Sequence, residues 1–177
     1  MVATATGGER PNIIMFLIDD QNPSSIAAFG GDTYTPNLDR MAEEGMKFTR
    51  AYVSSSVCTP SRYSFLTGRF AGNSHSKLYA DAVGGKGNQG LPNFNVALER
   101  DNMNVGNVLR EAGYTTGFVG KFHLTSELDF PEFYKGKDRW VDIPKDASPG
   151  PLTSAQFKHN ERWMRRYLET LGFSWAK

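Results

Sequence analysis

A short run of apolar residues, from Ile13 to Ile18, narrows the choice of fold more than any other part of the chain. The run is continuous and does not alternate with polar residues, and Asp19 and Asp20 follow it directly. Strands with one face in water alternate, whereas strands of a parallel sheet covered on both faces are apolar throughout. We therefore expect residues 12–18 to form an inner strand of a parallel sheet.

The rest of the chain alternates between strand and helix patterns. Further strands are expected at residues 48–53 and 114–119. Thr35 and Pro36 are typical of a helix start, and Gly45 of its stop. The other expected elements are helices at 60–66 and 104–112, a helix that Thr153 or Ser154 caps and Gly172 stops, and loops at 70–100 and 130–152. This alternation predicts an α/β fold with a mostly parallel sheet flanked by helices.

The final helix is expected to bury one stripe of side chains, Phe157, Met164, Tyr167, Leu168 and Leu171. The chain stops soon after this helix, where an α/β pattern would return to the sheet. We therefore expect residues 11–177 to be the N-terminal portion of a longer domain, with an incomplete sheet.

Composition removes several classes of function. With 177 residues and a net charge of +1, the chain has no basic surplus for nucleic acid or another polyanion. Its longest apolar run is too short to span a bilayer. A single cysteine excludes an internal disulfide. Residues 1–10 are small and polar, which predicts a disordered tail and no signal peptide. The chain as written would be cytoplasmic, or periplasmic or secreted if a signal was removed.

That cysteine opens a distinctive motif. Cys58 begins the sequence C-T-P-S-R, which ends at Arg62 and is followed by L-T-G-R at residues 66–69. Because Pro60 suits the first turn of a helix, Cys58 should lie near a helix N-terminus, where backbone N–H groups favour an anion. This position suits a bound anion and equally a thiolate.

Two other polar groups follow expected strands. Asp19 and Asp20 would lie at the edge where open α/β sheets bind ligands, and their oxygens suit Ca²⁺ or Mg²⁺. Lys121 and His123 follow the strand expected at 114–119 and could point the same way, offering a positive charge and a proton donor or acceptor. A solvated turn and an ordinary surface lysine with a hydrogen-bonded histidine are the plainer alternatives.

Together these motifs resemble the type I, formylglycine-dependent sulfatases. The resemblance spans residues 11–125 and includes T-P-N-L-D at 35–39, L-R-E-A-G-Y-T-T at 109–116 and G-K-F-H-L at 120–124. It implies the alkaline-phosphatase-like α/β fold. It also implies that a formylglycine-generating enzyme oxidises Cys58 to formylglycine, and that Asp19, Asp20 and residue 58 ligate one Ca²⁺ or Mg²⁺ ion.

The resemblance further implies a mechanism. Hydrated formylglycine, a gem-diol, would attack the sulfur of an aryl or carbohydrate sulfate ester, and its second hydroxyl would then expel sulfate. Arg62 would hold the diol, and Lys121 would bind the sulfate oxygens. His123 would hydrogen-bond the diol or assist its breakdown.

The family's later metal ligands and its second active-site histidine and lysine have no counterpart in these residues. We therefore expect this chain alone to have little activity. Three alternatives stay open. One is a phosphonate or phosphate monoester hydrolase of the same superfamily. The second is a truncated, non-catalytic fragment that binds a sulfated ligand or a partner. The third is a thiol enzyme that uses Cys58 directly.

Overall fold

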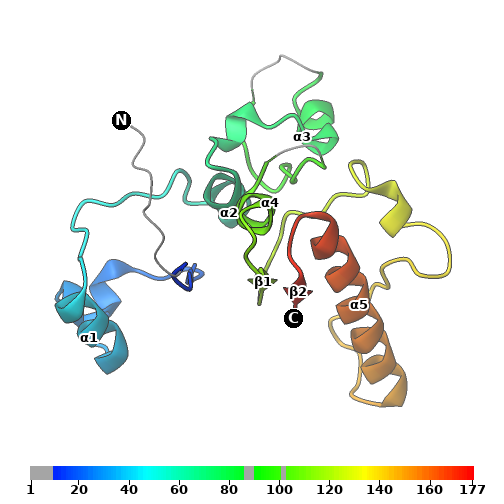
Figure 1. Ribbon diagram of the computed structural model, residues 1–177. Helices are drawn as coiled ribbons and strands as arrows, with labels where there is room; N and C mark the ends of the chain where they lie inside the picture. The colour runs from blue at the N-terminus through cyan, green and yellow to red at the C-terminus, as the bar shows by residue number, and fades with distance from the viewer. Residues whose placement is uncertain (1–9, 86–89, 101–102) are drawn as a thin grey trace. The chain divides into compact units, whose positions relative to one another are not determined.

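The computed structural model describes residues 10–85, 90–100 and 103–177, and divides into two compact units, residues 1–51 and 52–177 (Figure 1). Each unit is described by itself. The predicted N-terminal tail lies outside the described residues, apart from Arg10. None of the described helices combines the length and apolar character that crossing a membrane requires.

The first unit contains two 3-10 helices, Pro23–Ser25 and Ala27–Phe29, and helix α1, Pro36–Glu44. The predicted start and stop of α1 are confirmed, with Thr35 as its N-cap and Gly45 as its C-cap. The Thr35 hydroxyl does not cap its own helix. It accepts a hydrogen bond from the Ala27 N–H at 3.1 Å and donates one to the Asp39 carboxylate at 3.1 Å. Thr35 thereby ties α1 to the preceding 3-10 helix.

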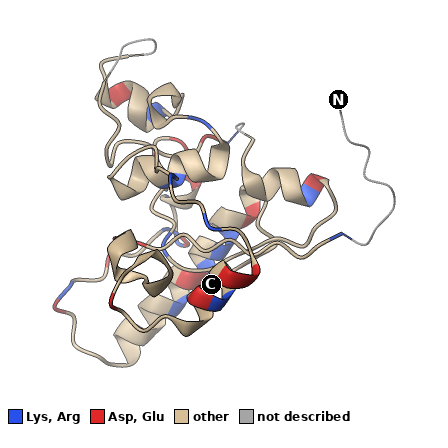
Figure 2. Ribbon diagram, turned by 90° about the vertical axis from the view of Figure 1, so that its left-hand side faces the viewer, with Lys and Arg blue, Asp and Glu red and all other residues tan. Residues whose placement is uncertain are grey.

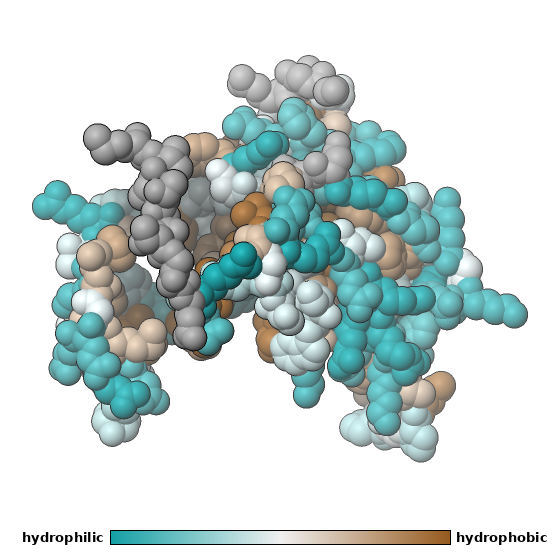
Figure 3. All heavy atoms as spheres, in the orientation of Figure 1, coloured by the Kyte–Doolittle hydropathy of each residue, from teal (hydrophilic) through white to brown (hydrophobic). Residues whose placement is uncertain are grey.

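The strand predicted at residues 12–18 is wrong for this structure. The segment has no strand partner among the described residues, and its side chains are largely exposed, with Ile14 and Phe16 each 76% exposed. The strand predicted at 48–53 is also wrong, and Phe48 and Tyr52 are exposed. A strand exists only where a neighbour pairs with its N–H and C=O groups, and an apolar run alone does not supply that neighbour. In Figure 3, brown apolar side chains are visible at the surface among teal polar ones.

The second unit holds the sheet and most of the helices. Strands β1 (Gly117–Phe118) and β2 (Trp175–Ala176) pair in parallel, with Gly117 opposite Trp175. The helices are α2 (Cys58–Thr67), α3 (Lys77–Ala82), α4 (Val105–Glu111) and α5 (Pro151–Thr170), and the 3-10 helices are Ala71–Asn73 and Pro131–Phe133. A parallel strand pair among helices confirms the predicted α/β class.

Helix α5 returns the chain to the sheet, which corrects the expectation that the chain ends before doing so. Gly172, with φ +96°, lets the chain reverse after the helix, and the Phe173 N–H donates to the Leu168 carbonyl at 3.1 Å. The Trp175 N–H then donates to the Thr116 carbonyl at 3.1 Å. The start of α5 also differs from the prediction, because Gly150 is its N-cap and Pro151 its first residue.

The core of the second unit is rich in aromatic side chains. Tyr167, Leu168 and Leu171 of the predicted α5 stripe are buried, and Met164 is partly buried. Phe157 of that stripe is 60% exposed, and Trp163 is buried instead. The ring of Trp163 stacks on that of Tyr167 with centroids 5.2 Å apart. Burial raises the pKa of Tyr167 well above that of an ordinary tyrosine.

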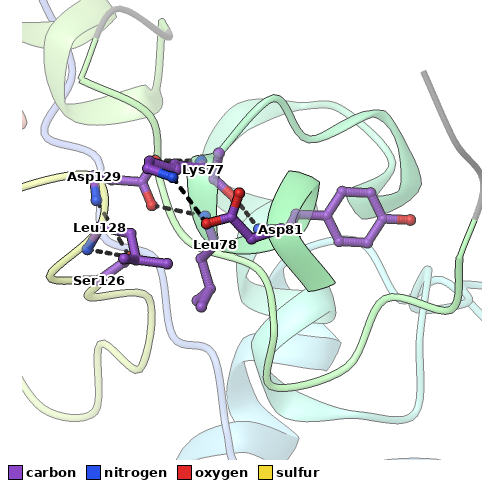
Figure 4. Close-up of polar contacts among 8 residues, drawn as sticks. Lys77, Leu78, Asp81, Ser126, Leu128 and Asp129 are labelled. Atoms are coloured by element: carbon purple, nitrogen blue, oxygen red, sulfur yellow. Dashed lines mark hydrogen bonds and ion pairs between the residues drawn. The ribbon is translucent and has the colours of Figure 1, made fainter. Parts of the chain in front are cut away.

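The segment predicted as one long loop, residues 70–100, contains α3. Ser76 caps this helix through the Tyr79 N–H at 3.2 Å. Figure 4 shows a second cap from outside the segment: the Asp129 carboxylate accepts hydrogen bonds from the N–H groups of Lys77 at 2.6 Å and Leu78 at 3.3 Å. The helix has only six residues, and its second cap comes from a distant part of the chain, so it was missed.

Candidate active site

Cys58 is the first residue of α2. The helix begins two residues earlier than predicted, with Val57 as its N-cap, and Pro60 lies within the first turn, where a missing N–H costs nothing. The Ser61 N–H makes the first helical bond, to the Val57 carbonyl at 3.1 Å. Cys58 is partly exposed, whereas Thr59 and Pro60 are buried. The expected place of Cys58 near a helix N-terminus is confirmed.

The segment after β1 carries Lys121 and His123. His123 has φ +60°, in the left-handed region that a residue with a side chain enters at a cost of about 1–2 kcal/mol. Two contacts hold this conformation. The Thr59 hydroxyl donates to the His123 carbonyl at 3.4 Å, and the Leu98 N–H donates to the Leu124 carbonyl at 3.2 Å. The left-handed turn interrupts the extended backbone from which we expected Lys121 and His123 to point the same way.

The start of α2 and this turn meet. The Cys58 Sγ lies 3.4 Å from the His123 Nδ1, within hydrogen-bond distance for sulfur, although 65 positions separate them. Arg62 is buried, and its Nη1 donates to the Lys121 carbonyl at 2.8 Å. The structure therefore brings the side chains of Cys58 and His123 together and places Arg62 against the backbone of Lys121. Arg62 lies four residues after Cys58 on α2 and bonds to the backbone of the turn that carries Lys121.

The buried carboxylate of Glu99 binds the Tyr63 side chain of α2. Both oxygens of Glu99 accept from the Tyr63 hydroxyl, at 3.0 and 3.1 Å. The same carboxylate accepts from the Ser74 hydroxyl at 2.8 Å and the His75 N–H at 2.6 Å. Burial, and then the charge of Glu99, raises the pKa of Tyr63 well above its ordinary value. No local pattern marks Glu99 as an acceptor, because its donors come from two separate segments.

An exposed aromatic ring borders the histidine. The ring centroids of Phe94 and His123 are 5.5 Å apart and their planes are inclined by 38°. Phe94 lies in the segment that the sequence predicts only as loop, so no periodic pattern marks it. Spacing and periodicity identify helices and strands, and a loop residue near a site becomes visible only in the fold.

Asp19 and Asp20 lie in the other unit, and both are exposed. Asp20 also has a left-handed backbone, with φ +54°. Within the described residues no group of three or more His, Cys, Asp or Glu side chains could hold a metal ion. Carboxylate oxygens are suitable ligands for Ca²⁺ and Mg²⁺. A calcium ion takes about six to eight oxygen ligands. The oxygens of Asp19 and Asp20 are therefore of the kind that such a cation binds, and they would supply part of its ligands.

The surface of the second unit carries charges of both signs. Lysine and arginine are interspersed with aspartate and glutamate (Figure 2), as in the Arg165–Glu161 pair at 2.8 Å on α5. Arg166 of the same helix lies 3.8 Å from Asp138. On α5, basic side chains therefore lie next to acidic ones.

Known proteins match most of this chain. The family model of the sulfatases matches residues 11–170. Human arylsulfatase G is 32% identical over 161 residues, which are 89% of this chain and 28% of that protein. Arylsulfatase A of Bos taurus is 34% identical over 154 residues, 85% of this chain and 29% of that protein. N-acetylgalactosamine-6-sulfatase of Rattus norvegicus is 35% identical over 147 residues, 77% of this chain and 26% of that protein.

A solved structure is also similar. It shows a protein in complex with its substrate, D-glucosamine-2-N,6-O-disulfate, and matches with a TM-score of 0.53 and 32% sequence identity. The match covers 67% of this chain and 21% of that one. The chain thus spans less than a third of the length of each relative and structure it resembles.

Proposed function

Because this chain belongs to the sulfatase family, we propose that it supplies part of the active site of an enzyme that hydrolyses sulfate esters. The observation that carries the proposal is the approach of the Cys58 Sγ to the His123 Nδ1 at 3.4 Å, at the N-terminus of α2. A nucleophile beside a proton acceptor, with helix N–H groups ready for an anion, suits transfer of a sulfuryl group. The match to sulfatases over residues 11–170 supports the same reaction.

Residue 58 would act after oxidation by a formylglycine-generating enzyme, which converts its CH₂–SH to an aldehyde. One hydroxyl of the hydrated aldehyde loses its proton and forms a bond to sulfur, and the ester S–O bond breaks to release the alcohol. The second hydroxyl then loses its proton, the aldehyde C=O forms again, and the bond from carbon to the sulfate oxygen breaks. In the structure, the Cys58 Sγ stands in for these oxygens.

The neighbouring side chains would have separate tasks. His123 is close enough to residue 58 to accept or return a proton in either step. Arg62 would hold the diol, while its bond to the Lys121 carbonyl fixes the turn that carries Lys121. Lys121 would bind the sulfate oxygens, where its charge offsets the negative charge of the transition state.

Asp19 and Asp20 would hold one Ca²⁺ or Mg²⁺ ion together with an oxygen of residue 58. The ion would polarise the attacking hydroxyl. Since two carboxylates and one hydroxyl are fewer oxygens than a hard cation takes, further oxygens would complete the set. This assignment is supported by the adjacent, exposed carboxylates and by the chemistry of their oxygens.

The substrate we propose is an aryl or carbohydrate sulfate. Arylsulfatases and an N-acetylgalactosamine-6-sulfatase are among the relatives, and the similar solved structure holds a glucosamine disulfate. None of the matches reported above bears the name of a phosphate or phosphonate hydrolase, so that alternative is not favoured.

The first test is the mass of the tryptic peptide Ala51–Arg62 after co-expression with a formylglycine-generating enzyme. We expect a species lighter by the difference between CH₂–SH and CHO that reacts with a hydrazine. The enzyme of which this chain forms part, matured in the same way, should hydrolyse an aryl sulfate faster than the matching aryl phosphate. An unmodified thiol under these conditions would favour a non-catalytic chain or direct thiol chemistry.

A further inference from the structure

A compact turn presents Phe94 beside the site. The Asn93 N–H donates to the Asn95 side-chain oxygen at 2.6 Å, and the Asn95 side-chain nitrogen donates to the Leu91 carbonyl at 3.4 Å. We call residues 91–95 the rim turn. Asparagine side chains that bond to nearby backbone groups fix such turns without help from a helix or sheet. The position of Phe94 is therefore set by its own two neighbours.

The residues that directly follow the rim turn are part of the core. Val96, Ala97 and Leu98 follow Phe94 closely and are fully buried. The Leu98 N–H donates to the Leu124 carbonyl at 3.2 Å, directly after His123 in the chain. This hydrogen bond joins the two segments four residues after Phe94 and one residue after His123. The closeness of the two rings is a product of this shared anchor.

Phe94 itself stays in the open. Its side chain is 61% exposed, while its ring centroid lies 5.5 Å from that of His123. His123 in turn lies 3.4 Å from the Cys58 Sγ. A large apolar ring in water gains nothing from its exposure, whereas a ring beside a reactive group can bury its free face against a ligand.

We propose that Phe94 is a specificity-determining residue, on whose exposed face the aryl or pyranose ring of the sulfate ester stacks while the sulfate group lies at Cys58 and His123. This inference rests on the proposed sulfatase function. It selects esters in which the sulfated oxygen is attached to, or one carbon from, a ring with an apolar face. Small aliphatic sulfates reach the same site without this contact.

Turnover tests the selection. In the formylglycine-bearing enzyme of which this chain forms part, Phe94→Ala should raise KM for para-nitrophenyl sulfate about tenfold, the upper range for an aromatic contact, with kcat nearly unchanged. KM for ethyl sulfate should stay the same, and Phe94→Trp should restore binding of the ring. The matched control is Phe157→Ala, because Phe157 is 60% exposed on α5 and makes no ring contact within the described residues.

Binding gives a readout that needs no turnover. Phe94→Trp places an indole at the rim, and its fluorescence should change on titration with phenyl sulfate or a glucosamine monosulfate, but not with inorganic sulfate. Phe157→Trp should respond to none of them. A response to phenyl sulfate alone assigns an aryl substrate, and a response to the sugar alone assigns a carbohydrate substrate.

The two hypotheses fail in different ways. Normal hydrolysis of para-nitrophenyl sulfate by Phe94→Ala, with KM unchanged, would refute the role of Phe94 and leave the sulfatase function intact. A fluorescence response to ring sulfates without any hydrolysis by the enzyme of which this chain forms part would refute the sulfatase function and leave ring binding at Phe94 intact. A silent indole in Phe94→Trp, together with an unaltered KM in Phe94→Ala, would overturn the inference.

Discussion

The segment around Cys58 and the segment around Asp19 have opposite surroundings. The first lies in a network of bonds from α2 to the turn at His123 and to buried Glu99. The second follows an apolar run whose side chains are exposed. Both carry motif residues that the sequence marks equally well. The difference teaches that motifs equally clear in the sequence can lie in a hydrogen-bonded, partly buried segment or in an exposed one.

The largest expected effect is at residue 58. In the enzyme of which this chain forms part, matured by a formylglycine-generating enzyme, Cys58→Ala should lower kcat for an aryl sulfate by about a thousandfold or more, because it removes the nucleophile. Cys58→Ser should be as slow in steady state, since serine has no second hydroxyl to expel sulfate. Mass spectrometry should detect sulfated serine in that variant. Retained turnover in Cys58→Ala would exclude a nucleophile at this position.

Glu99 tests the brace behind the same helix. Glu99→Ala leaves the Tyr63 and Ser74 hydroxyls and the His75 N–H without their shared acceptor, which should lower the free energy of unfolding by about 3 kcal/mol. Urea denaturation measures it. Glu132→Ala, at an exposed carboxylate, is the control and should cost less than about 0.5 kcal/mol. Equal losses in both variants would contradict the role of burial.

Substitutions of Asp19 and Asp20 test whether the exposed segment binds the metal ion. Asp19→Asn and Asp20→Asn should each weaken Ca²⁺ binding and lower kcat/KM by about 30-fold, since each removes a charged oxygen ligand. The thermal midpoint without added calcium should hardly change, because both side chains are exposed. Isothermal titration and differential scanning calorimetry measure the two quantities. Unaltered calcium affinity in both variants would remove the pair from the metal site.

High pH should weaken the second unit. The pKa values of Tyr63 and Tyr167 are raised in the folded protein, mainly by burial. Above about pH 10 the unfolded tyrosines ionise while the folded ones keep their protons, so stability is present below that pH and falls as pH rises. We expect a loss of about 1.4 kcal/mol per tyrosine for each further pH unit.

Urea denaturation at pH 9 and pH 11 measures this loss, and Tyr63→Phe provides the comparison. That variant should lose less stability between the two pH values than the parent protein, because one raised tyrosine is absent. An identical pH dependence in the two proteins would show that Tyr63 ionises as easily when folded as when unfolded.

The smallest effect is expected in the apolar run. Phe16→Ser changes an exposed side chain and should alter the free energy of unfolding by less than about 0.5 kcal/mol. Leu168→Ala, in the buried face of α5, should cost about 2–5 kcal/mol in the same assay. A loss of more than 2 kcal/mol in Phe16→Ser would show that the run is buried, and the contrast between the two segments would disappear.

Sequence reasoning succeeded where local chemistry decides the structure. Thr35, Pro36 and Gly45 bound α1, and Gly172 ends α5, because caps and left-handed turns depend on the residue in place. The α/β class followed from the alternation of patterns. The strands at 12–18 and 48–53 failed, since pairing depends on a partner elsewhere in the chain.

The candidate site was predicted in part. Cys58 lies beside His123, and Arg62 contacts the backbone of Lys121 within the second unit, while the roles of these residues stay predictions. Glu99 and Phe94 were missed, because a buried acceptor and an exposed loop ring are defined by three-dimensional neighbours. The left-handed conformation of His123 was missed too, since it is held by Thr59 from another segment.

The pairing of β1 with β2 has a consequence for the order of folding. The two strands lie 58 residues apart in the chain, and β2 comes immediately before Lys177. A ribosome therefore delivers β1 long before its partner, and closing so long a connection carries an entropic cost that local helix formation does not. Helices α2 to α5 can form as they emerge. The parallel pair is expected to be the last element to assemble, as the rate-limiting step.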